Sequence, residues 1–504
     1  MKLEKSIPPI PKQPTQRPIV RIASLPNVEA FQAHVRSLGL ELPCDASILT
    51  ADRSPMAQPI DSLRINGRRI GNRWVIHPME GWDGTREGGA TDTVRRRWQR
   101  FGQSGAKLIF GCEAMAVRPD GRANPHQLLI TEQTKKDLAE LLTLLRKAHR
   151  DRFGSDDDLV VGFQLTHSGR FSRPTGQPAP KIAYRHPILD RRLGIDSEAP
   201  VLTDAELDRL VEDFVRAARI AYEVGADFVD IKHCHGYLLH ELLSAHTRPG
   251  KYGGSFENRT RMLRNIVAAI RADGNPIDLA VRLSAFDTVP FHPDPTLSKP
   301  GKLGPGIPEP YESFLPYRYV FGARFEDPLT PDLNEPLQFL HLCANLGIRL
   351  VNLTAGSPYY NPHIQRPAQY PPIDGYYPPN DPLLDVVRQI QVARILRTYA
   401  PKELILIGTG YTYLQDYLPH VAQAVVREGW IDLVGIGRMA LSYPGLIADS
   451  LEKGRINRKA ICRTFSDCTT APRLGLRSGC YPLDPFYAQL PDFQKLKERK
   501  RQLR

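Results

Sequence analysis

The sequence has no long apolar run and few cysteines. No stretch approaches the roughly 20 apolar residues that a membrane-spanning helix needs, and the N-terminus, Met1-Lys-Leu-Glu-Lys-Ser-Ile-Pro-Pro, has no apolar signal core. We therefore expect a cytoplasmic protein that has no membrane partner. The seven cysteines are odd in number and scattered except for the last three, which argues against a disulfide framework.

The sequence also has no nucleic-acid-binding motif, although its net charge is +12. Part of this charge lies in residues 495–504, which are rich in Lys and Arg. Such a run could contact an anionic surface, but without an accompanying motif a solvated helical tail is favoured. We expect no nucleic-acid partner.

Strand-like and helix-like patterns alternate along most of the chain. Strands are expected at residues 73–79, 106–113, 159–166, 226–231, 279–284, 348–354, 404–408 and 431–436. A helical pattern follows each one, at residues 92–104, 132–150, 204–224, 258–272, 336–345, 383–399, 415–427 and 443–453. Eight βα units without a change of order predict an α/β protein with a single (β/α)8 TIM barrel, because a doubly wound sheet more often stops at about six strands.

The flanking segments suggest three parts. Residues 1–60 are rich in proline and contain one short helical pattern, so they form an N-terminal extension; residues 61–460 form the barrel, and residues 461–504 form a Cys-containing segment with a basic tail. Asn66-Gly67 predicts a hairpin that covers the bottom of the barrel. The long connections 285–335 and 357–382, after strands five and six, are either lids over the active face or packed decorations.

One strand end concentrates chemically active residues. The strand that ends at Ile231 runs directly into Lys232, His233, Cys234, His235 and Tyr237. Ligands bind at the carboxyl ends of strands in parallel α/β proteins, so this segment marks a candidate active site. A barrel lyase that uses a lysine Schiff base is one enzyme class that would fit it.

Two later strand ends are rich in glycine. Strand seven ends Ile-Gly-Thr-Gly-Tyr, with Gly408 and Gly410, and strand eight ends Gly-Ile-Gly-Arg, with Gly437 and Arg438. Glycine lets the backbone approach phosphate oxygens and arginine adds a forked cation, so a phosphate site is expected here.

Together, in order, these motifs resemble one family. The His-Gly-Tyr-Leu sequence at 235–238, followed by Tyr-Gly-Gly-Ser-Phe-Glu-Asn-Arg at 252–259, is similar to the old yellow enzyme family of flavin-dependent reductases, and most similar to its 2,4-dienoyl-CoA reductase branch. The resemblance runs from about residue 63 to about residue 451. It implies an FMN-dependent oxidoreductase that passes hydride from diffusible NADH or NADPH through flavin N5 to a small conjugated carbonyl substrate.

The resemblance also implies roles for individual residues. Lys232 and His235 would bind the substrate's carbonyl oxygen, and Tyr237 would give a proton to its α-carbon. The flavin would be held by His77, Pro78, Met79, Glu80, Ala114, Gln164 and Arg282, and its phosphate by Gly408, Gly410, Gly437 and Arg438.

Two of these residues depart from the family pattern. Lys232 stands where the family has His, and Glu80 stands where it usually has Thr or Cys. A lone charge buried beside a flavin is costly, so we expect the Glu80 carboxylate and the Lys232 ammonium to form a salt bridge. The alternative is that Glu80 pairs with a loop cation such as Arg86.

The last three cysteines mark another departure. The dienoyl-CoA reductase branch holds an iron–sulfur cluster with four cysteines, whereas this sequence has only Cys462, Cys468 and Cys480 there and no Cys-X-X-Cys pair. We expect free thiols and no metal. These 504 residues contain no Gly-X-Gly-X-X-Gly fingerprint of the branch's nucleotide-binding domain, so we expect hydride to come from diffusible nicotinamide or from a separate reductase partner. The protein could also form a homo-oligomer. A flavin-binding barrel with lost or partner-dependent turnover is the alternative function.

Overall fold

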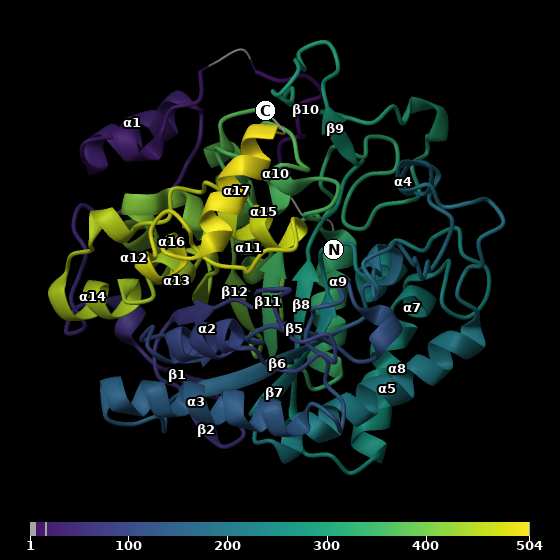
Figure 1. Cartoon of the computed structure of the whole chain (residues 1–504), viewed down its shortest axis with the longest axis horizontal. Helices are drawn as coiled ribbons and strands as arrows, with labels where there is room; N and C mark the ends of the chain where they lie inside the picture. The colour runs from purple at the N-terminus through teal and green to yellow at the C-terminus, as the bar shows by residue number, and fades with distance from the viewer. Residues whose placement is uncertain (1–6, 16–17, 503–504) are drawn as a thin grey trace.

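Eight parallel strands close into a barrel at the centre of the computed structural model, which describes residues 7–15 and 18–502 (Figure 1). Each strand pairs in parallel with the next, and β13 pairs with β3 to close the ring. The predicted TIM barrel is therefore confirmed. Its strands are β3 (Trp74–Ile76), β4 (Leu108–Ile109), β6 (Val160–Thr166), β7 (Phe228–His233), β8 (Asp278–Ser284), β11 (Leu350–Thr354), β12 (Ile405–Gly408) and β13 (Leu433–Ile436).

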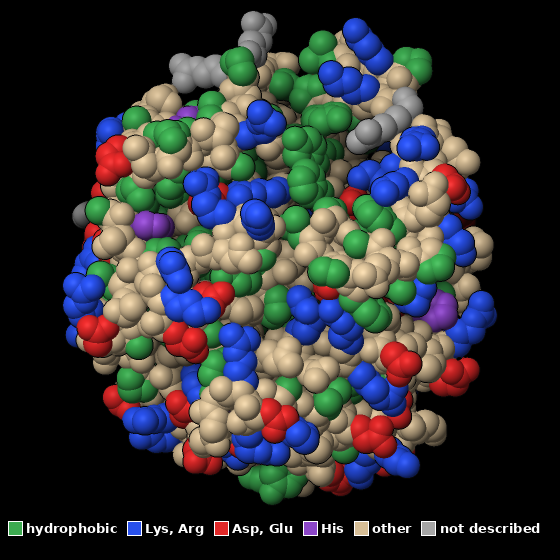
Figure 2. All heavy atoms as spheres, turned by 60° about the vertical axis from the view of Figure 1, so that its left-hand side comes forward, with side chains coloured by type: hydrophobic (Ala, Val, Ile, Leu, Met, Phe, Trp, Pro, Cys, Tyr) green, Lys and Arg blue, Asp and Glu red, His purple; other side chains and the backbone are tan. Residues whose placement is uncertain are grey.

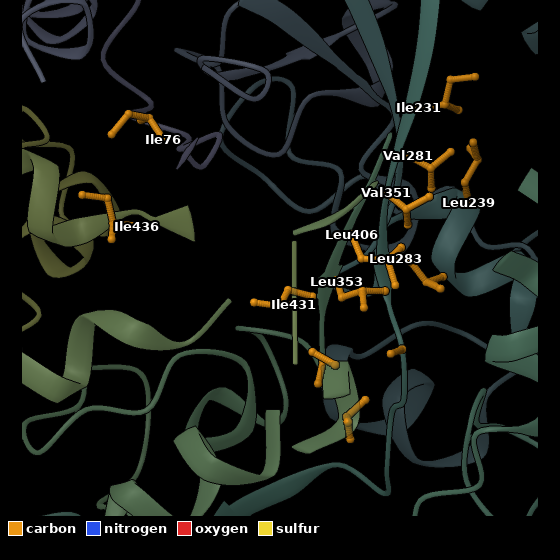
Figure 3. Close-up of a cluster of buried hydrophobic side chains, with 14 of the residues drawn as sticks. Ile76, Ile231, Leu239, Val281, Leu283, Val351, Leu353, Leu406, Ile431 and Ile436 are labelled. Atoms are coloured by element: carbon orange, nitrogen blue, oxygen red, sulfur yellow. The ribbon is translucent and has the colours of Figure 1, made fainter. Parts of the chain in front are cut away.

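A ring of helices surrounds these strands, as the alternating sequence pattern predicts. The apolar stripe of each helix packs on the outward-facing side chains of the strands. Figure 3 shows part of this layer, in which Ile231, Val281, Val351 and Leu406 come from four neighbouring strands. The main helices are α2 (Asp92–Gly102), α3 (Lys135–Phe153), α5 (Asp204–Glu223), α8 (Arg261–Ala272), α9 (Asn334–Asn345), α11 (Pro382–Tyr399), α12 (Leu418–Arg427) and α14 (Leu446–Lys453).

The second barrel strand is interrupted, whereas the sequence pattern predicts one strand over residues 106–113. β4 ends at Ile109, and the chain turns through Gly111 (φ +91°) and Cys112 (φ +49°) before β5 (Ala114–Ala116) continues along β6. A Cβ atom on Gly111 would lie 2.8 Å from the Cβ of Gln164, so only glycine fits there. The expectation of a continuous strand is therefore wrong at this turn.

The predicted hairpin covers the amino-terminal end of the barrel. β1 (Ile60–Ile65) and β2 (Arg68–Ile70) are antiparallel and joined by Asn66-Gly67. The Asn66 backbone N–H donates to Asp278 (2.6 Å) and its side-chain amide donates to Asp227 (3.0 Å), next to the starts of β8 and β7. Apolar hairpin side chains pack with the barrel interior, so this end is closed.

The other end of the barrel carries the long connections and the C-terminal segment. Their elements are β9 (Phe291–Pro293), β10 (Gly306–Pro308), α10 (Pro362–Gln365), α13 (Arg438–Ser442), α15 (Asp467–Arg473), α16 (Pro485–Ala488) and α17 (Pro491–Gln502). The terminal helix α17 is anchored, because Leu496 packs beside Ala471 and Tyr481, and the Lys500 ammonium lies 2.5 Å from Asp467.

Short helices and the N-terminal segment complete the architecture. The remaining α-helices are α1 (Val28–Ser37), α4 (Pro187–Leu193), α6 (Leu238–Leu243) and α7 (Phe256–Arg259). In α1, Phe31 stacks on Tyr417 at 4.3 Å between ring centroids, so the extension packs on the barrel. In the described part of the chain, no helix is long and apolar enough to cross a membrane. Figure 2 shows Lys and Arg side chains scattered among acidic ones on the viewed face.

Candidate functional site

One cavity opens at the carboxyl ends of the barrel strands and brings most of the predicted site residues together. Those that line it are His77, Pro78, Met79, Glu80, Gln164, Lys232, His235, Tyr237, Arg282, Gly410, Gly437 and Arg438. Two predicted residues do not line it. Ala114 lies on β5, paired in register with Gln164, and Gly408 ends β12 beneath Tyr411. We call this space the central cavity.

A buried carboxyl group orients the residues on the cavity floor. Asp230 on β7 accepts the side-chain amide N–H of Gln164 and the backbone N–H of Arg282 (2.7 Å). Burial raises the pKa of Asp230 to about 7. Because the Gln164 nitrogen is engaged by Asp230, its carbonyl oxygen is left for the cavity. The sequence analysis missed Asp230, although it lies two residues before Lys232 and therefore on the same face of the strand.

Glu80 and Lys232 form the salt bridge that the sequence predicts. The Lys232 ammonium lies 2.6 Å from Glu80 Oε1, and the two side chains are only 3% and 14% exposed. The other oxygen, Oε2, accepts the Tyr237 hydroxyl (2.7 Å) and the indole N–H of Trp82 (2.9 Å). The alternative pairing of Glu80 with Arg86 is therefore wrong.

Two tyrosines extend this network. The hydroxyls of Tyr237 and Tyr359 lie 2.8 Å apart, and the Lys232 ammonium lies 4.0 Å from the centre of the Tyr237 ring. Burial, together with the negative charge of Glu80, raises the pKa of Tyr237 well above its usual value, so the phenol keeps its proton. Tyr359 comes from the long connection after β11, so this connection overhangs the cavity.

The histidines of the cavity are neutral. Burial lowers the pKa of His77 and of His235 well below the usual range, and nearby cations lower both further. Asn352 on β11 lies 3.0 Å from His77 Nδ1 and holds its ring. The Nε2 atom of His235 lies 3.1 Å from the side-chain amide of Gln365. Both rings are therefore fixed as hydrogen-bonding groups rather than as cations.

Three arginines from separate segments gather in one part of the cavity, which we call the anion-binding end. Arg438 follows β13, Arg366 follows α10, and Arg473 lies on α15. Burial, with the charges of Arg473 and Arg438, lowers the pKa of Arg366 to about 9. Nη2 of Arg366 and Nη1 of Arg438 are buried and have no hydrogen-bond partner within residues 7–15 and 18–502. This end of the cavity is built for an anion.

Arg366 and the C-terminal segment are contributions that the sequence analysis missed. Arg366 Nη1 donates to the hydroxyl of Thr469 on α15, so the connection after β11 and the C-terminal segment meet over the anion-binding end. The one usable signal is that Arg366 lies inside a long connection that leaves the carboxyl end of a barrel strand.

The three late cysteines are free thiols, and Cys468 lines the central cavity. Burial raises the pKa of Cys462 above its usual value. Considering the described residues only, no group of three or more His, Cys, Asp or Glu side chains could hold a metal ion. The absence of an iron–sulfur cluster stays a prediction.

Comparisons with known proteins agree with this geometry. Residues 58–296 match the model of the NADH:flavin oxidoreductase / NADH oxidase family. The NADPH dehydrogenase of Geobacillus sp. (strain WCH70) is 33% identical over 242 residues, which cover 46% of this chain and 63% of that protein. The Bacillus subtilis (strain 168) NADPH dehydrogenase is 32% identical over 234 residues, which cover 45% of this chain and 63% of that protein. The matched part spans less than two thirds of these relatives.

Solved structures share the fold. An old yellow enzyme homologue from Zymomonas mobilis superposes with a TM-score of 0.52 at 20% identity, covering 80% of this chain and 94% of that one. A 2-naphthoyl-CoA reductase superposes with a TM-score of 0.60 at 17% sequence identity, and the match covers 87% of this chain and 58% of that chain. The dienoyl-CoA reductase branch stays a prediction. Residues 58–296 therefore resemble the NADH:flavin oxidoreductase / NADH oxidase family, and the chain shares its fold with an old yellow enzyme homologue, as its motifs indicate.

Proposed function

We propose that this chain is an FMN-dependent oxidoreductase that uses NADH or NADPH to reduce a conjugated carbonyl compound, with the flavin held by the barrel of residues 61–460. The observation that carries the proposal is the polarity of the central cavity. The cavity presents buried arginine donors without partners in the described chain, and it also presents a buried Lys–Glu–Tyr network. Such a cavity suits a cofactor with a phosphate tail and a substrate that takes up a proton.

The residues present fit FMN. Arg438 and Arg366 hold the unpaired donors that a phosphate group would satisfy, and Gly410 and Gly437 bring backbone to the same end. Nε of Arg282 is also buried without a partner in the described chain, as a group beside the flavin N1 position would be. When bound, FMN would supply a ring that accepts hydride from nicotinamide and passes it to the substrate.

Lys232, His235 and Tyr237 would act on the substrate. The Lys232 ammonium and neutral His235 would bind the carbonyl oxygen, and Tyr237 would protonate the α-carbon. The Tyr237 hydroxyl donates to Glu80 in this structure, so it has to rotate away from Glu80 to reach a substrate. Tyr359, 2.8 Å away, is then placed to donate to the Tyr237 oxygen.

The Glu80–Lys232 pair argues against the Schiff-base lyase alternative. Schiff-base formation needs an amine that is free to attack, whereas Lys232 Nζ donates a hydrogen bond to Glu80 at 2.6 Å. An ammonium remains suited to polarising a carbonyl group, and this favours reduction of a conjugated carbonyl compound.

A visible absorption spectrum tests cofactor binding. We expect purified protein, or protein reconstituted with FMN, to show the yellow absorption of bound flavin, and Arg438→Met and Arg366→Met to weaken FMN binding by about tenfold or more each. Arg455→Met, at an exposed arginine away from the cavity, is the matched control and should bind FMN as the parent does. A colourless protein that takes up no FMN would refute the proposal.

Anaerobic rapid mixing tests turnover. NADH or NADPH should bleach the bound flavin, and 2-cyclohexenone, a simple conjugated ketone, should restore its colour. Flavin that neither nicotinamide bleaches would instead indicate a barrel with lost or partner-dependent turnover.

A further inference from the structure

A second, smaller cleft lies outside the central cavity and shares no lining residue with it. It is formed where the loops after β5 and β6 meet the first turns of α5, and its volume is about 100 Å³. Its polar lining comprises Arg118, Asp120, His167, Lys181, Glu206 and Arg209. We call it the α5 cleft.

The carboxylates of the α5 cleft already have partners. Asp120 accepts two hydrogen bonds from the Arg118 guanidinium (2.5 and 2.9 Å). Glu206 closes the capping box of α5 and accepts the Thr203 backbone N–H (2.7 Å). These two acids therefore make their hydrogen bonds with Thr203 and Arg118 rather than with the other cations of the cleft.

Unlike these carboxylates, the cations Lys181 and Arg209 make no hydrogen bonds through their side chains in the described part of the chain. Neither side chain has an ion-pair partner among the described residues, and both raise the positive potential around Glu206. Two cations without hydrogen-bond partners thus face one cleft from different elements, and together with Arg118 they outnumber the carboxylates of Asp120 and Glu206 there.

His167 supplies a directed donor at the base of the cleft. Its Nδ1 accepts the Gly169 backbone N–H (3.1 Å), so the ring proton of the neutral imidazole is on Nε2, which has no partner among residues 7–15 and 18–502. The side chain is only 3% exposed, and burial lowers its pKa to about 4. The ring packs against Gly121, where a Cβ atom would lie 2.6 Å from His167 Cδ2.

We propose that the α5 cleft is a second binding site, for a phosphate group held by the His167 Nε2–H, the Lys181 ammonium and the Arg209 guanidinium. Three donors from three separate segments suit a tetrahedral anion with several oxygens better than a planar carboxylate. The group could belong to free inorganic phosphate or to a phosphate ester, since both present the same oxygens.

The cleft is joined through the backbone to the segment that carries Tyr237. The His167 carbonyl accepts the backbone N–H of Leu238 (3.1 Å), the residue after Tyr237. A ligand that holds His167 therefore also stabilises the turn that places Tyr237 in the central cavity. The site and its ligand class do not depend on the proposed oxidoreductase activity.

Calorimetric titration of the FMN-loaded protein tests the site, because bound FMN fills the anion-binding end of the central cavity. At constant ionic strength, we expect inorganic phosphate to bind saturably at one site. The variant Lys181→Gln/Arg209→Gln should weaken this binding by about tenfold or more. The control Lys402→Gln/Arg455→Gln removes the same charge from exposed positions outside the cleft and should leave it unchanged.

A second titration with glycerol 3-phosphate distinguishes the two sources of the ligand. Tighter binding of the ester than of inorganic phosphate indicates a phosphate ester, and equal or weaker binding indicates free phosphate. Absence of saturable phosphate binding to the parent protein, or equal weakening in the cleft variant and the control, would overturn the proposal.

Discussion

Breaking the Glu80–Lys232 pair is expected to cost far more stability than breaking a surface pair. The two groups lie 2.6 Å apart and are 14% and 3% exposed, so removal of either partner leaves a charge that water barely reaches. Removing one partner of a buried ion pair costs about 3–5 kcal/mol. We therefore expect Glu80→Gln and Lys232→Met each to lower the free energy of unfolding by about that amount.

The double variant separates pairing from independent effects. Once Lys232 is gone, replacing Glu80 removes an unpaired buried charge, so the double variant should be more stable than the sum of the single losses predicts, by about 2 kcal/mol or more. Urea unfolding followed by tryptophan fluorescence measures each loss. Single losses that add to within about 0.5 kcal/mol would refute the reasoning.

An exposed lysine–aspartate pair provides the matched control. Lys147 and Asp151 lie 2.5 Å apart on one face of α3, but their side chains are 63% and 59% exposed. The same cycle with Lys147→Met and Asp151→Asn should give a coupling of only about 0.3–0.5 kcal/mol, because solvent screens exposed pairs.

Three further predictions concern other parts of the site. Tyr237→Phe should slow reoxidation of the reduced flavin by 2-cyclohexenone by about 100-fold, because the proton donor is lost. Bleaching of the flavin by nicotinamide should stay intact. Equal slowing of both half-reactions in rapid mixing would contradict this role. Burial raises the folded-state pKa of Asp230 to about 7, above the usual value of about 3.9 for an aspartate side chain. Its contribution to stability is therefore full below that usual value and is lost as pH rises through 7. Asp230→Asn should therefore match the parent in urea midpoint near pH 4 and exceed it increasingly up to pH 8, whereas a pH-independent difference would contradict the assignment. In urea unfolding, Gly111→Ala should destabilise the protein by about 1–3 kcal/mol more than the control Gly154→Ala. Both residues have φ near +90°, but only Gly111 has side-chain atoms within 4 Å of the new methyl group. Equal losses of stability would contradict the packing argument.

Short-range patterns in the sequence determine the barrel. Alternating strand and helix periods at regular spacing specify a parallel α/β order, and the closed ring is the solution that buries both faces of such a sheet. The turn Asn66-Gly67 specifies its hairpin in the same local way. The break of the second strand escaped prediction, because it depends on how closely the chain at Gly111 approaches Gln164 on a neighbouring strand.

The motifs likewise predict which strand ends form the site. Lys232, His235, Tyr237 and Arg438 line one cavity because the carboxyl ends of parallel strands meet on one face of a barrel. The pairing of Lys232 with Glu80 could be predicted as well, since two buried charges of opposite sign on that face are less costly together than apart.

The tertiary structure alone decided the contacts between segments that are distant in the sequence. Arg366 and Thr469 meet over the anion-binding end, and Tyr359 reaches Tyr237, although no local pattern links these residues. The partners of a buried arginine or tyrosine depend on how long loops pack over the barrel. That packing is set by the sum of many weak contacts across the whole chain, and such contacts have no period that a sequence reading can detect.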